Sequence, residues 1–361
     1  MHSISPSRSD EEATARLETL LTPAPTAAPL QAAIGRLNSR FSIYAATCPS
    51  PLPAAGLIIT PEIRHQSELY LPIDEIAAVF NRLYRFSLRY PPILSSTPFH
   101  TTSSWADLFA GLPPHFQGSA NPARLLEELT ADRDLLVEFL FTSFLPHRFY
   151  GGFARYPGQR EFIRHWLTDR KTPELRCLDA ACGTGEESYG LARLMMEQGI
   201  PAENLNIEGW TIEPLEVWAA AYGCFPHDRQ REALFRAATA ELFRQRFHTR
   251  IRFLSRDLLD PPSLERFDLI LCNGLLGGPI IHQPDQMERV VRNLSRLLAP
   301  GGIMLVADSF HGGWKQQCPQ PRLRALLETT GLKSFEAGEG IGGGNHRSGL
   351  FFEYLRSSAI L

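Results

Sequence analysis

Residues 175–191 read Leu-Arg-Cys-Leu-Asp-Ala-Ala-Cys-Gly-Thr-Gly-Glu-Glu-Ser-Tyr-Gly-Leu, and this stretch decides the fold. A short apolar run ends at Asp179, small residues follow, and a helical pattern begins after Gly185. A strand that turns through glycines into a helix presents bare backbone N–H groups at the positive end of that helix. The sequence therefore predicts a strand, a ligand-binding loop and a helix in direct succession.

The loop has the order acid, x, small, x, Gly, x, Gly, which differs from the dinucleotide pattern Gly-x-Gly-x-x-Gly. Asp179, Ala181, Gly183 and Gly185 carry this order, and it resembles the first motif of S-adenosylmethionine-dependent methyltransferases. The continuation Gly-Glu-Glu-x-Tyr is similar to the same segment of the CheR-type methyltransferases, which modify chemotaxis receptors. The resemblance covers roughly residues 145 to 310 and implies S-adenosylmethionine as the cofactor.

The second half of the chain alternates short apolar runs with helical stretches, which is typical of a doubly wound α/β domain. Strands are expected at residues 176–180, 206–212, 251–254, 267–272 and 303–307, with two more around 338–349. Helices are expected at 186–198, from Pro214 onward, and at 286–298, where Pro300-Gly301-Gly302 should form a turn. We expect a class I methyltransferase fold, an α/β Rossmann-like sheet with helices on both faces, plus a mainly helical N-terminal domain.

Composition divides the chain into a flexible tail, a mainly helical N-terminal domain and the methyltransferase domain, at residues 1–30, 31–146 and 147–361. In the N-terminal domain, helices are expected at residues 73–88 and after Asn121-Pro122, a cap followed by a first-turn proline. Residues 91–116 are rich in Pro and Ser, so we expect them to be irregular.

Bulk properties exclude several functions. The formal net charge is −3 and no Lys/Arg-rich run is present, which argues against a nucleic-acid partner. No apolar run approaches the roughly 18 residues that span a bilayer, so no membrane insertion is expected. The polar start of the chain is unlike a secretory signal. The six scattered cysteines form no CxxC pair and the histidines show no metal spacing, which indicates a reduced, cytoplasmic protein without a metal site.

Candidate cofactor-binding residues lie before the first strand, in the glycine loop, and at the ends of the next three strands. They are Arg155, Asp179, Ala180, Ala181, Gly183, Gly185, Glu186, Thr211, Glu213, Asp257, Leu258, Asn273 and Gly274. Open α/β sheets bind their ligands at the carboxyl ends of the strands, where most of these residues are expected. An ionised carboxylate acceptor needs no general base, so no catalytic residue is assigned.

The charged candidates each have an alternative role. Asp179 can orient the loop by accepting N–H bonds or can meet the ammonium group of the ligand. Glu186 opens a helix, where the dipole alone favours an acid, whereas the CheR resemblance implies that it contacts the cofactor directly. Arg155 lies where the family has Phe-Phe-Arg and can clamp the methionine carboxylate of the cofactor, or it can be a solvated surface arginine.

The chain departs from the family at three places. Thr211 and Glu213 stand in place of the two acids of the family's Thr-Asp-x-Asp, and chemistry favours Glu213 for the ribose contact. Asp257 stands where family members carry Asn; an acid suits the adenine amino group, and a loop cap is the alternative. After Cys272, the family's Arg-Asn and its Ile-Tyr-Phe residues are replaced, which bears on the acceptor pocket.

The acceptor is less well determined than the cofactor. CheR-type enzymes contact receptors through a small inserted β-subdomain, whereas residues 226–250 are short and polar, so we expect helix and loop there. The resemblance implies methyl transfer to a protein carboxylate. A small-molecule acceptor and a non-catalytic signalling module that binds S-adenosylmethionine or S-adenosylhomocysteine are the alternatives. The acceptor cleft is expected between residues 274–284 and the N-terminal domain, and the oligomeric state stays open.

A second glycine-rich stretch, residues 338–343, fits Gly-x-Gly-x-x-Gly literally. Only a weak strand precedes it and no helical pattern follows it, so the context of a phosphate-binding loop is missing. We expect a flexible hairpin tip near the acceptor.

Overall fold

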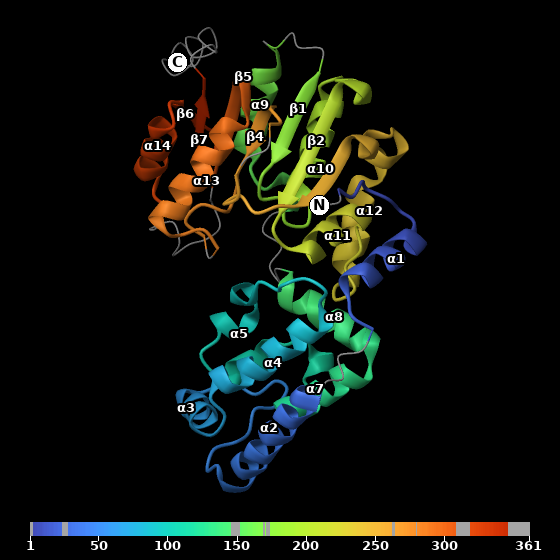
Figure 1. Cartoon of the computed structure of the whole chain (residues 1–361), viewed down its shortest axis with the longest axis vertical. Coiled ribbons are helices and arrows are strands. Elements are labelled where there is room, and N and C mark those ends of the chain that lie inside the picture. The colour runs from blue at the N-terminus through green and yellow to red at the C-terminus, as the bar shows by residue number, and fades with distance from the viewer. Residues whose placement is uncertain are drawn as a thin grey trace. The chain divides into compact units, whose positions relative to one another are not determined.

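The computed structural model describes residues 3–23, 28–145, 152–168, 170, 174–261, 264–278, 280–307 and 318–345. The chain divides into two compact units (Figure 1). Residues 14–147 form one unit, called here the helical unit, and residues 1–13 with 148–361 form the other, called the sheet unit. Helix α1 (Asp10–Leu20) runs across the boundary between them.

One mixed sheet forms the centre of the sheet unit. Its strands in the described residues are β1 (Leu175–Asp179), β2 (Leu205–Thr211), β3 (Ile251–Ser255), β4 (Phe267–Leu271), β5 (Leu298–Val306), β6 (Lys333–Ala337) and β7 (Gly340–Gly344). Their order is β3-β2-β1-β4-β5-β7-β6. The first five are parallel, and β7 runs antiparallel to both β5 and β6. The expected class I methyltransferase fold is therefore confirmed.

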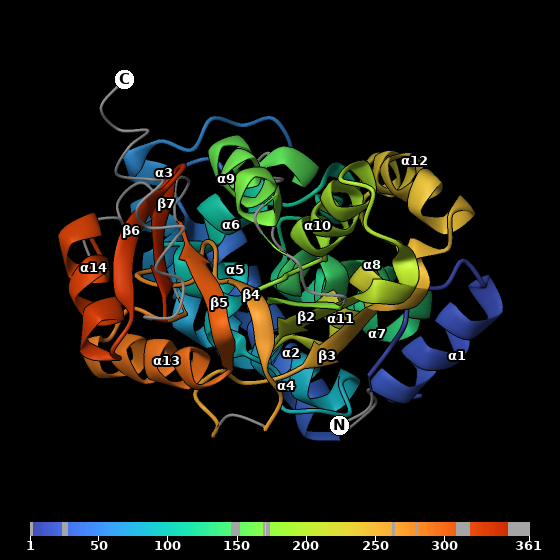
Figure 2. The ribbon, with the colours of Figure 1, turned by 90° about the horizontal axis from the view of Figure 1, so that it is seen from above.

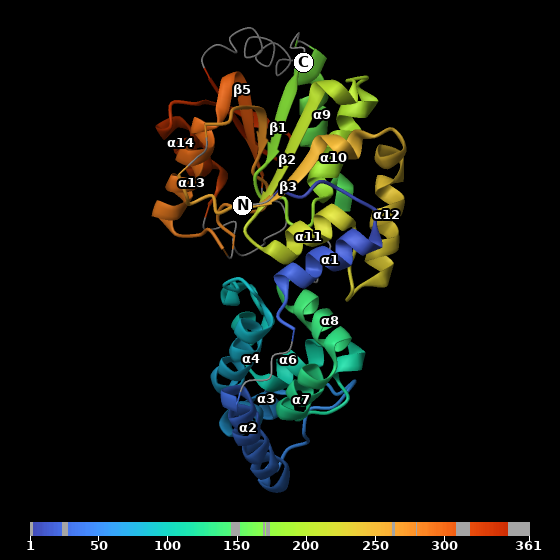
Figure 3. The same ribbon diagram turned by 45° about the vertical axis from the view of Figure 1, so that its right-hand side comes forward.

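Helices cover both faces of this sheet (Figure 2). They are α9 (Pro157–Thr168), α10 (Glu186–Glu197), α11 (Pro214–Tyr222), α12 (Arg229–Arg244), α13 (Pro284–Arg296) and α14 (Gln320–Thr329). On one face α13 and α14 bury Leu178 and Ile270. On the other, Tyr189 of α10 packs between Phe253 of β3 and Phe235 of α12. Figure 3 shows α10, α11 and α12 on the opposite side of β1–β3 from α13 and α14.

The register of the strands sets the position of the ligand end. Asp179 pairs with Gly209 of β2 and with Leu271 of β4. The strand order reverses between β1 and β4, and the carboxyl ends of strands at such a point form the ligand crevice of an open α/β sheet. The residues after β1, β2 and β4 therefore lie around one crevice.

Strand β5 begins earlier than its sequence suggests. Helix α13 ends at Arg296 and β5 starts at Leu298, so Pro300-Gly301-Gly302 lies inside the strand rather than in a turn before it. The pairing with β4 shifts register between Phe267 and Leu269, which is a bulge that accommodates the extra residues.

The N-terminal segment is packed where it is described, so the expected flexible tail does not hold for residues 3–23. Ile4 donates its N–H to the carbonyl of Phe253 (2.9 Å) and accepts the N–H of Phe253 (2.8 Å) at the outer edge of β3. The Arg8 guanidinium lies 4.3 Å from the ring centre of Phe243 in α12. An exposed strand edge offers unpaired backbone groups to any nearby segment, which composition alone does not reveal.

The helical unit contains α2 (Ala28–Thr47), α3 (Pro61–Tyr70), α4 (Ile73–Ser87), α5 (Pro98–Thr101), α6 (Trp105–Gly111), α7 (Pro122–Ala131) and α8 (Arg133–Phe144). The expected α4 and the Asn121 cap of α7 are confirmed. Residues 91–116 are partly helical, since they contain α5 and α6. The Ser104 hydroxyl caps α6. Asp132 caps α8 and so divides the second expected helix in two. Within the described ranges, no helix combines the length and apolar content needed to cross a membrane.

The second glycine-rich stretch forms the turn after β6 and most of β7. The expected hairpin is confirmed, but β7 lies inside the sheet between β5 and β6 rather than at a flexible tip. Its glycines permit close packing, since a Cβ atom at Gly342 would lie 2.2 Å from the ring of Phe335.

Candidate functional site

The glycine loop joins β1 to α10 through two glycines with different roles. Gly185 is the N-cap of α10 with φ +89°, and a Cβ atom there would lie 2.9 Å from the ring of Phe253. Gly183 has φ +51°, and a Cβ atom there would meet only the Glu216 carboxylate, at 3.9 Å. Gly185 is therefore required by packing, whereas Gly183 borders open space beside the positive end of α10.

Asp179 lies at the end of β1 and is almost fully buried, with 2% of its surface exposed. Ser188, on the first turn of α10, donates its hydroxyl to the Asp179 carboxylate at 2.7 Å. Burial raises the pKa of Asp179 to about 7, while the Ser188 hydrogen bond acts in the opposite direction. The Ser188 contact ties Asp179 to the helix that follows the loop, and its role toward a ligand stays a prediction.

The Glu186 carboxylate has two side-chain partners, Thr184 and Arg231. Its carboxylate accepts the Thr184 hydroxyl (2.8 and 2.7 Å) and pairs with the Arg231 guanidinium of α12 at 2.8 Å. The Arg231 and Glu186 side chains are 11% and 13% exposed, so this ion pair is largely shielded from water. The sequence predicted a helix around Arg231 but gave no sign of this pair.

The next residue, Glu187, lies with the other candidates. Burial raises the pKa of Glu187 to about 8, and the nearby Asp179 charge adds to the effect. Arg155 and the hydrogen bond from Asn273 lower the pKa, which places both beside the Glu187 carboxylate. Glu187, the second glutamate of the Gly-Glu-Glu motif, was not among the candidates. Its neighbours lie at the end of β1, after β4 and before α9.

Asn273 connects three elements at the end of β4. Its side-chain amide exchanges two hydrogen bonds with Gln159 of α9, at 2.8 and 3.2 Å. Its carbonyl oxygen also accepts the N–H of Ala307, after β5, at 2.9 Å. Gly274 donates its backbone N–H to the backbone carbonyl of Ala307. Gln159, 1% exposed, is a second residue that sequence reasoning missed, because only the fold brings α9 to β4.

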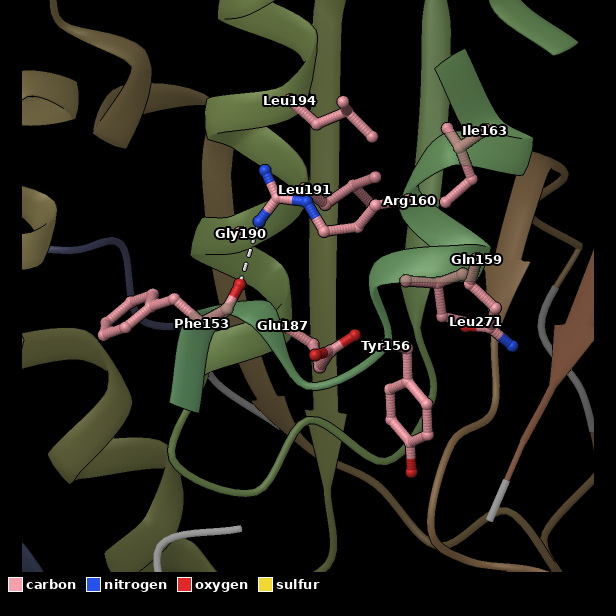
Figure 4. A pocket seen from close by; sticks show the side chains of 10 residues that line it. All are labelled: Phe153, Tyr156, Gln159, Arg160, Ile163, Glu187, Gly190, Leu191, Leu194 and Leu271. Carbon is pink, nitrogen blue, oxygen red and sulfur yellow. Dashed lines mark hydrogen bonds between the residues drawn. The ribbon is translucent and has the colours of Figure 1, made fainter. Parts of the chain in front are cut away.

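A small pocket lies between α9 and α10 (Figure 4). It is lined by Phe153, Tyr156, Gln159, Arg160, Ile163, Glu187, Gly190, Leu191, Leu194 and Leu271. Arg160 closes one side by donating to the carbonyl of Phe153 at 2.9 Å. The pocket has room for about one water molecule, so it borders the site but is too small for an adenosyl group.

A second acid, Glu216, lies near the end of β2 beside the predicted Glu213. Glu213 caps α11 by accepting the N–H of Leu215 at 3.1 Å. Thr211 instead donates its hydroxyl to Glu216, whose carboxylate is the group beside Gly183. Burial raises the pKa of Glu216 to about 7, opposed by the Thr211 hydrogen bond. Glu216 thus lies closer to the glycine loop than its sequence position suggested.

Hydrogen bonds from Asp257 and from Asn293 of α13 hold the loop after β3. The Asp257 carboxylate accepts the N–H of Leu259 at 2.8 Å, which is the loop-cap role considered for it. Asn293 of α13 donates to the carbonyls of Leu258 (2.9 Å) and Asp260 (2.8 Å). These contacts fix Leu258 at the carboxyl end of β3, the position expected for the adenine pocket.

The charge of the site suits a cationic ligand. Carboxylates from β1, α10 and α11 surround the glycine loop, namely Asp179, Glu186, Glu187, Glu213 and Glu216. Arg231 is engaged with one of them, and Arg155 lies beside another. S-adenosylmethionine carries ammonium and sulfonium groups together with one carboxylate, so an acidic site with arginines beside the acids fits it.

A protein-family model described as "CheR methyltransferase, SAM binding domain" matches residues 155–311. Residues 155–311 are a CheR-type domain. This part of the chain is accordingly a CheR-like, S-adenosylmethionine-dependent methyltransferase domain. The match begins at Arg155 and spans the glycine loop and every strand from β1 to β5.

Curated relatives share this domain. A chemotaxis protein methyltransferase of Listeria monocytogenes is 26% identical over 193 residues, which are 51% of this chain and 72% of the relative. The probable biofilm formation methyltransferase WspC of Pseudomonas putida is 29% identical over 146 residues, or 37% of this chain and 34% of the relative. The matched segment thus makes up most of the first relative and about a third of the second.

The segment between α11 and β3 has no β-subdomain in this protein. Residues 226–250, all described, contain α12 and the short 3-10 helix at Phe247–Arg250, with no strand. The expectation of helix and loop is confirmed. In its place, α12 supplies Arg231 to the glycine loop.

The acids at β2 give a prediction. Glu216→Gln is expected to weaken S-adenosylhomocysteine binding roughly 10- to 150-fold, because a charge-assisted hydrogen bond contributes about 1.5–3 kcal/mol. Glu213→Gln should weaken binding less, and should mainly lower thermal stability through loss of the α11 cap, by about 1 kcal/mol. Calorimetric titration of the two variants measures the difference.

Glu208 is the matched control for this comparison. It also lies on β2, but it pairs with Arg252 (2.7 Å) and accepts the Trp210 indole N–H (2.9 Å), away from the carboxyl end. Glu208→Gln should lower stability and leave affinity unchanged. A larger loss of affinity with Glu213→Gln than with Glu216→Gln would return the ribose contact to Glu213.

Proposed function

We propose that the CheR-type domain binds S-adenosylmethionine around the ends of β1, β2, β3 and β4 and transfers its methyl group to a carboxylate of a protein partner. The observation that supports this most is the open space at Gly183, next to the positive end of α10 and ringed by carboxylates. We retain as cofactor-binding candidates Arg155, Asp179, Ala180, Ala181, Gly183, Gly185, Glu186, Thr211, Glu213, Asp257, Leu258, Asn273 and Gly274, and add Glu187 and Glu216.

The proposed roles follow from charge. Arg155 would bind the methionine carboxylate of the cofactor, while Glu187 would face its ammonium group. Glu216, held by Thr211, would accept hydrogen bonds from the ribose hydroxyls, and the loop at Leu258 would border the adenine. Asp179 would keep the glycine loop in the conformation that admits the ligand.

The cofactor supplies a methyl group already activated by the sulfonium centre. The protein therefore mainly aligns the acceptor and excludes water, and both effects lower the barrier without a proton transfer. A carboxylate acceptor is ionised near neutral pH and attacks without a general base. Glu187, with its raised pKa, is accordingly assigned to binding rather than to proton abstraction.

We infer that the partner differs from that of an ordinary chemotaxis receptor methyltransferase. CheR-type enzymes recognise receptors through the β-subdomain that residues 226–250 lack, and the residues after Cys272 are replaced as well. Substrate choice depends on the parts that differ, whereas shared cofactor residues establish only a shared cofactor. We also propose a cytoplasmic location.

Transfer of label tests the proposal. Purified protein is incubated with methyl-labelled S-adenosylmethionine and fractionated cell extract, and the labelled products are separated by size. We expect label on protein that is released as volatile methanol by mild base, the signature of a carboxyl methyl ester. Stable label on small molecules would contradict the protein acceptor, and efficient methylation of purified receptor fragments would contradict the inferred difference in partner.

A further inference from the structure

The N-terminus of α9 obtains its cap from a distant part of the chain. Helix α9 has no acidic residue in its first turn, and Tyr156, which precedes it, offers no capping carboxylate. The Glu339 carboxylate, in the turn between β6 and β7, accepts the N–H of Gly158 at 2.7 Å and the N–H of Gln159 at 2.9 Å. Two of the N–H groups that a helix start leaves unsatisfied are thereby bound by one side chain.

Two glycines bring the turn and the helix into backbone contact. A Cβ atom at Gly338 would lie 2.2 Å from the carbonyl carbon of Gly158, and one at Gly158 would lie 2.9 Å from the Cα of Gly338. Neither position accepts a side chain without movement of the backbone. The Glu339 carboxylate is consequently held against the helix start by the close backbone contact at the preceding Gly338.

Helix α9 links the Glu339 cap to the candidate cofactor site. Gln159 lies on its first turn, and its amide is bound to Asn273 by two hydrogen bonds. Glu187 of α10 lines the same small pocket as Gln159, and the nearby Asn273 amide lowers the pKa of its carboxylate. A set of hydrogen bonds therefore runs from the β6–β7 turn through α9 to Asn273 at the end of β4, and Glu187 lies in the pocket that Gln159 lines.

We propose that Glu339 is a positioning residue for cofactor binding: by capping α9 it fixes Gln159, which orients Asn273 toward Glu187. The proposal rests on the assignment of Asn273 and Glu187 to the cofactor site. It also gives the second glycine-rich stretch a role, since Gly338 and Glu339 belong to that stretch.

Loss of this orientation has a signature beyond loss of stability. The groups that face Glu187 are Asp179 on β1, Asn273 after β4, Arg155 before α9 and Arg160 on α9. The Asn273 hydrogen bond lowers the pKa of Glu187, so misorientation of the amide raises that pKa. If cofactor binding needs ionised Glu187, the pH at which affinity reaches half its maximum moves upward.

The test compares Glu339→Gln with the wild-type full-length chain. S-adenosylhomocysteine is titrated calorimetrically between pH 6 and 9. We expect affinity near neutral pH to fall on the order of five- to tenfold, with an upward shift of the pH midpoint. Glu339→Asp, which keeps the charge on a shorter side chain, should restore part of both.

Two controls separate positioning from stability. Glu336→Gln lies on the same hairpin, where Glu336 is 67% exposed and pairs with Arg324, and it should change neither affinity nor midpoint. Leu323→Ala, in the core under α14, should lower the melting temperature without moving the midpoint. If Glu339→Gln fails to fold, Gln159→Met breaks the same link with the cap intact and should give the same shift.

The outcomes distinguish the two proposals. An unchanged midpoint in both Glu339→Gln and Gln159→Met, with Asn273→Ala and Glu187→Gln weakening binding, overturns the role of Glu339. Unchanged affinity in Asn273→Ala and Glu187→Gln overturns the site assignment itself. A midpoint shift in Leu323→Ala equal to that of Glu339→Gln would assign the effect to stability.

Discussion

A Gly183→Leu protein is expected to bind S-adenosylhomocysteine at least about a hundredfold more weakly than wild type, a loss of ~2.7 kcal/mol. A Cβ atom at this position meets only the Glu216 carboxylate within 4 Å, so a side chain can begin here without a clash with the folded protein. It then occupies the space in which the cofactor must approach the bare backbone of the loop. Affinity should therefore be lost while the fold is kept.

The backbone cost of this substitution is modest. Gly183 has φ +51°, and a residue with a side chain costs roughly 1–2 kcal/mol in that conformation. Circular dichroism should show native helix content with a small decrease in melting temperature. Gly185→Ala, by contrast, places its Cβ 2.9 Å from the Phe253 ring and should destabilise the fold itself.

Gly199 provides the matched control. It follows α10 at the opposite end of the helix, has φ +72°, and a Cβ atom there would have no neighbour within 4 Å. Gly199→Leu thus carries the same backbone cost without reaching the site, and its affinity should equal that of wild type. Unchanged affinity in a folded Gly183→Leu protein would show that the loop serves the structure only.

The sequence predicted the sheet and the loop because their signals are local. Strands β1, β2 and β4 lie within one residue of their expected bounds, since each is an apolar run closed by a polar or small residue. The geometry of the glycine loop is also set locally, because Gly183 and Gly185 have the positive φ that glycine adopts readily.

The contacts of the acids could not be predicted in the same way. The partner of Glu186 is Arg231, 45 residues away on α12, and that of Asn273 is Gln159, 114 residues away on α9. Neither pair has a spacing rule, because the fold alone brings the elements together. The family resemblance directed attention to the first glutamate of the motif, whereas burial and neighbouring charge single out the second, Glu187.

The N-terminal residues show another limit of composition. Their Ser, Pro and Thr content indicated a flexible tail, yet Ile4 forms a backbone bridge to Phe253 and Arg8 contacts α12. Backbone pairing to a strand edge needs no particular side chain, so it leaves no compositional trace. The ring of Phe253 lies beneath Gly185, which connects this segment to the cofactor loop through a single residue.

Cofactor affinity is expected to rise steeply with pH between about 6 and 8. Burial raises the pKa of Asp179 to about 7, that of Glu187 to about 8 and that of Glu216 to about 7. A ligand with positive charge stabilises the ionised carboxylates, so their pKa values fall in the complex. Binding below the pKa values of the free protein must therefore release protons.

Linkage gives the size and sign of the effect. Each proton released makes affinity increase by up to about tenfold per pH unit, until the pH exceeds the pKa of the free protein. Affinity should thus be lowest at acidic pH, increase through the range 7–8 and level off above it. S-adenosylmethionine should show a steeper increase than S-adenosylhomocysteine, because its sulfonium adds a second positive charge near the same carboxylates.

Titration calorimetry in buffers of different ionisation enthalpy counts the protons released. Glu187→Gln should lower the count by about one and flatten the rise, whereas Glu197→Gln, at the exposed end of the same helix, should leave both unchanged. Affinity that is flat or falls between pH 6 and 8 would mean that these carboxylates stay ionised in the free protein or do not face the ligand. The same experiment on Glu186→Gln decides which glutamate of the motif meets the cofactor, because only removal of that glutamate should lower the proton count.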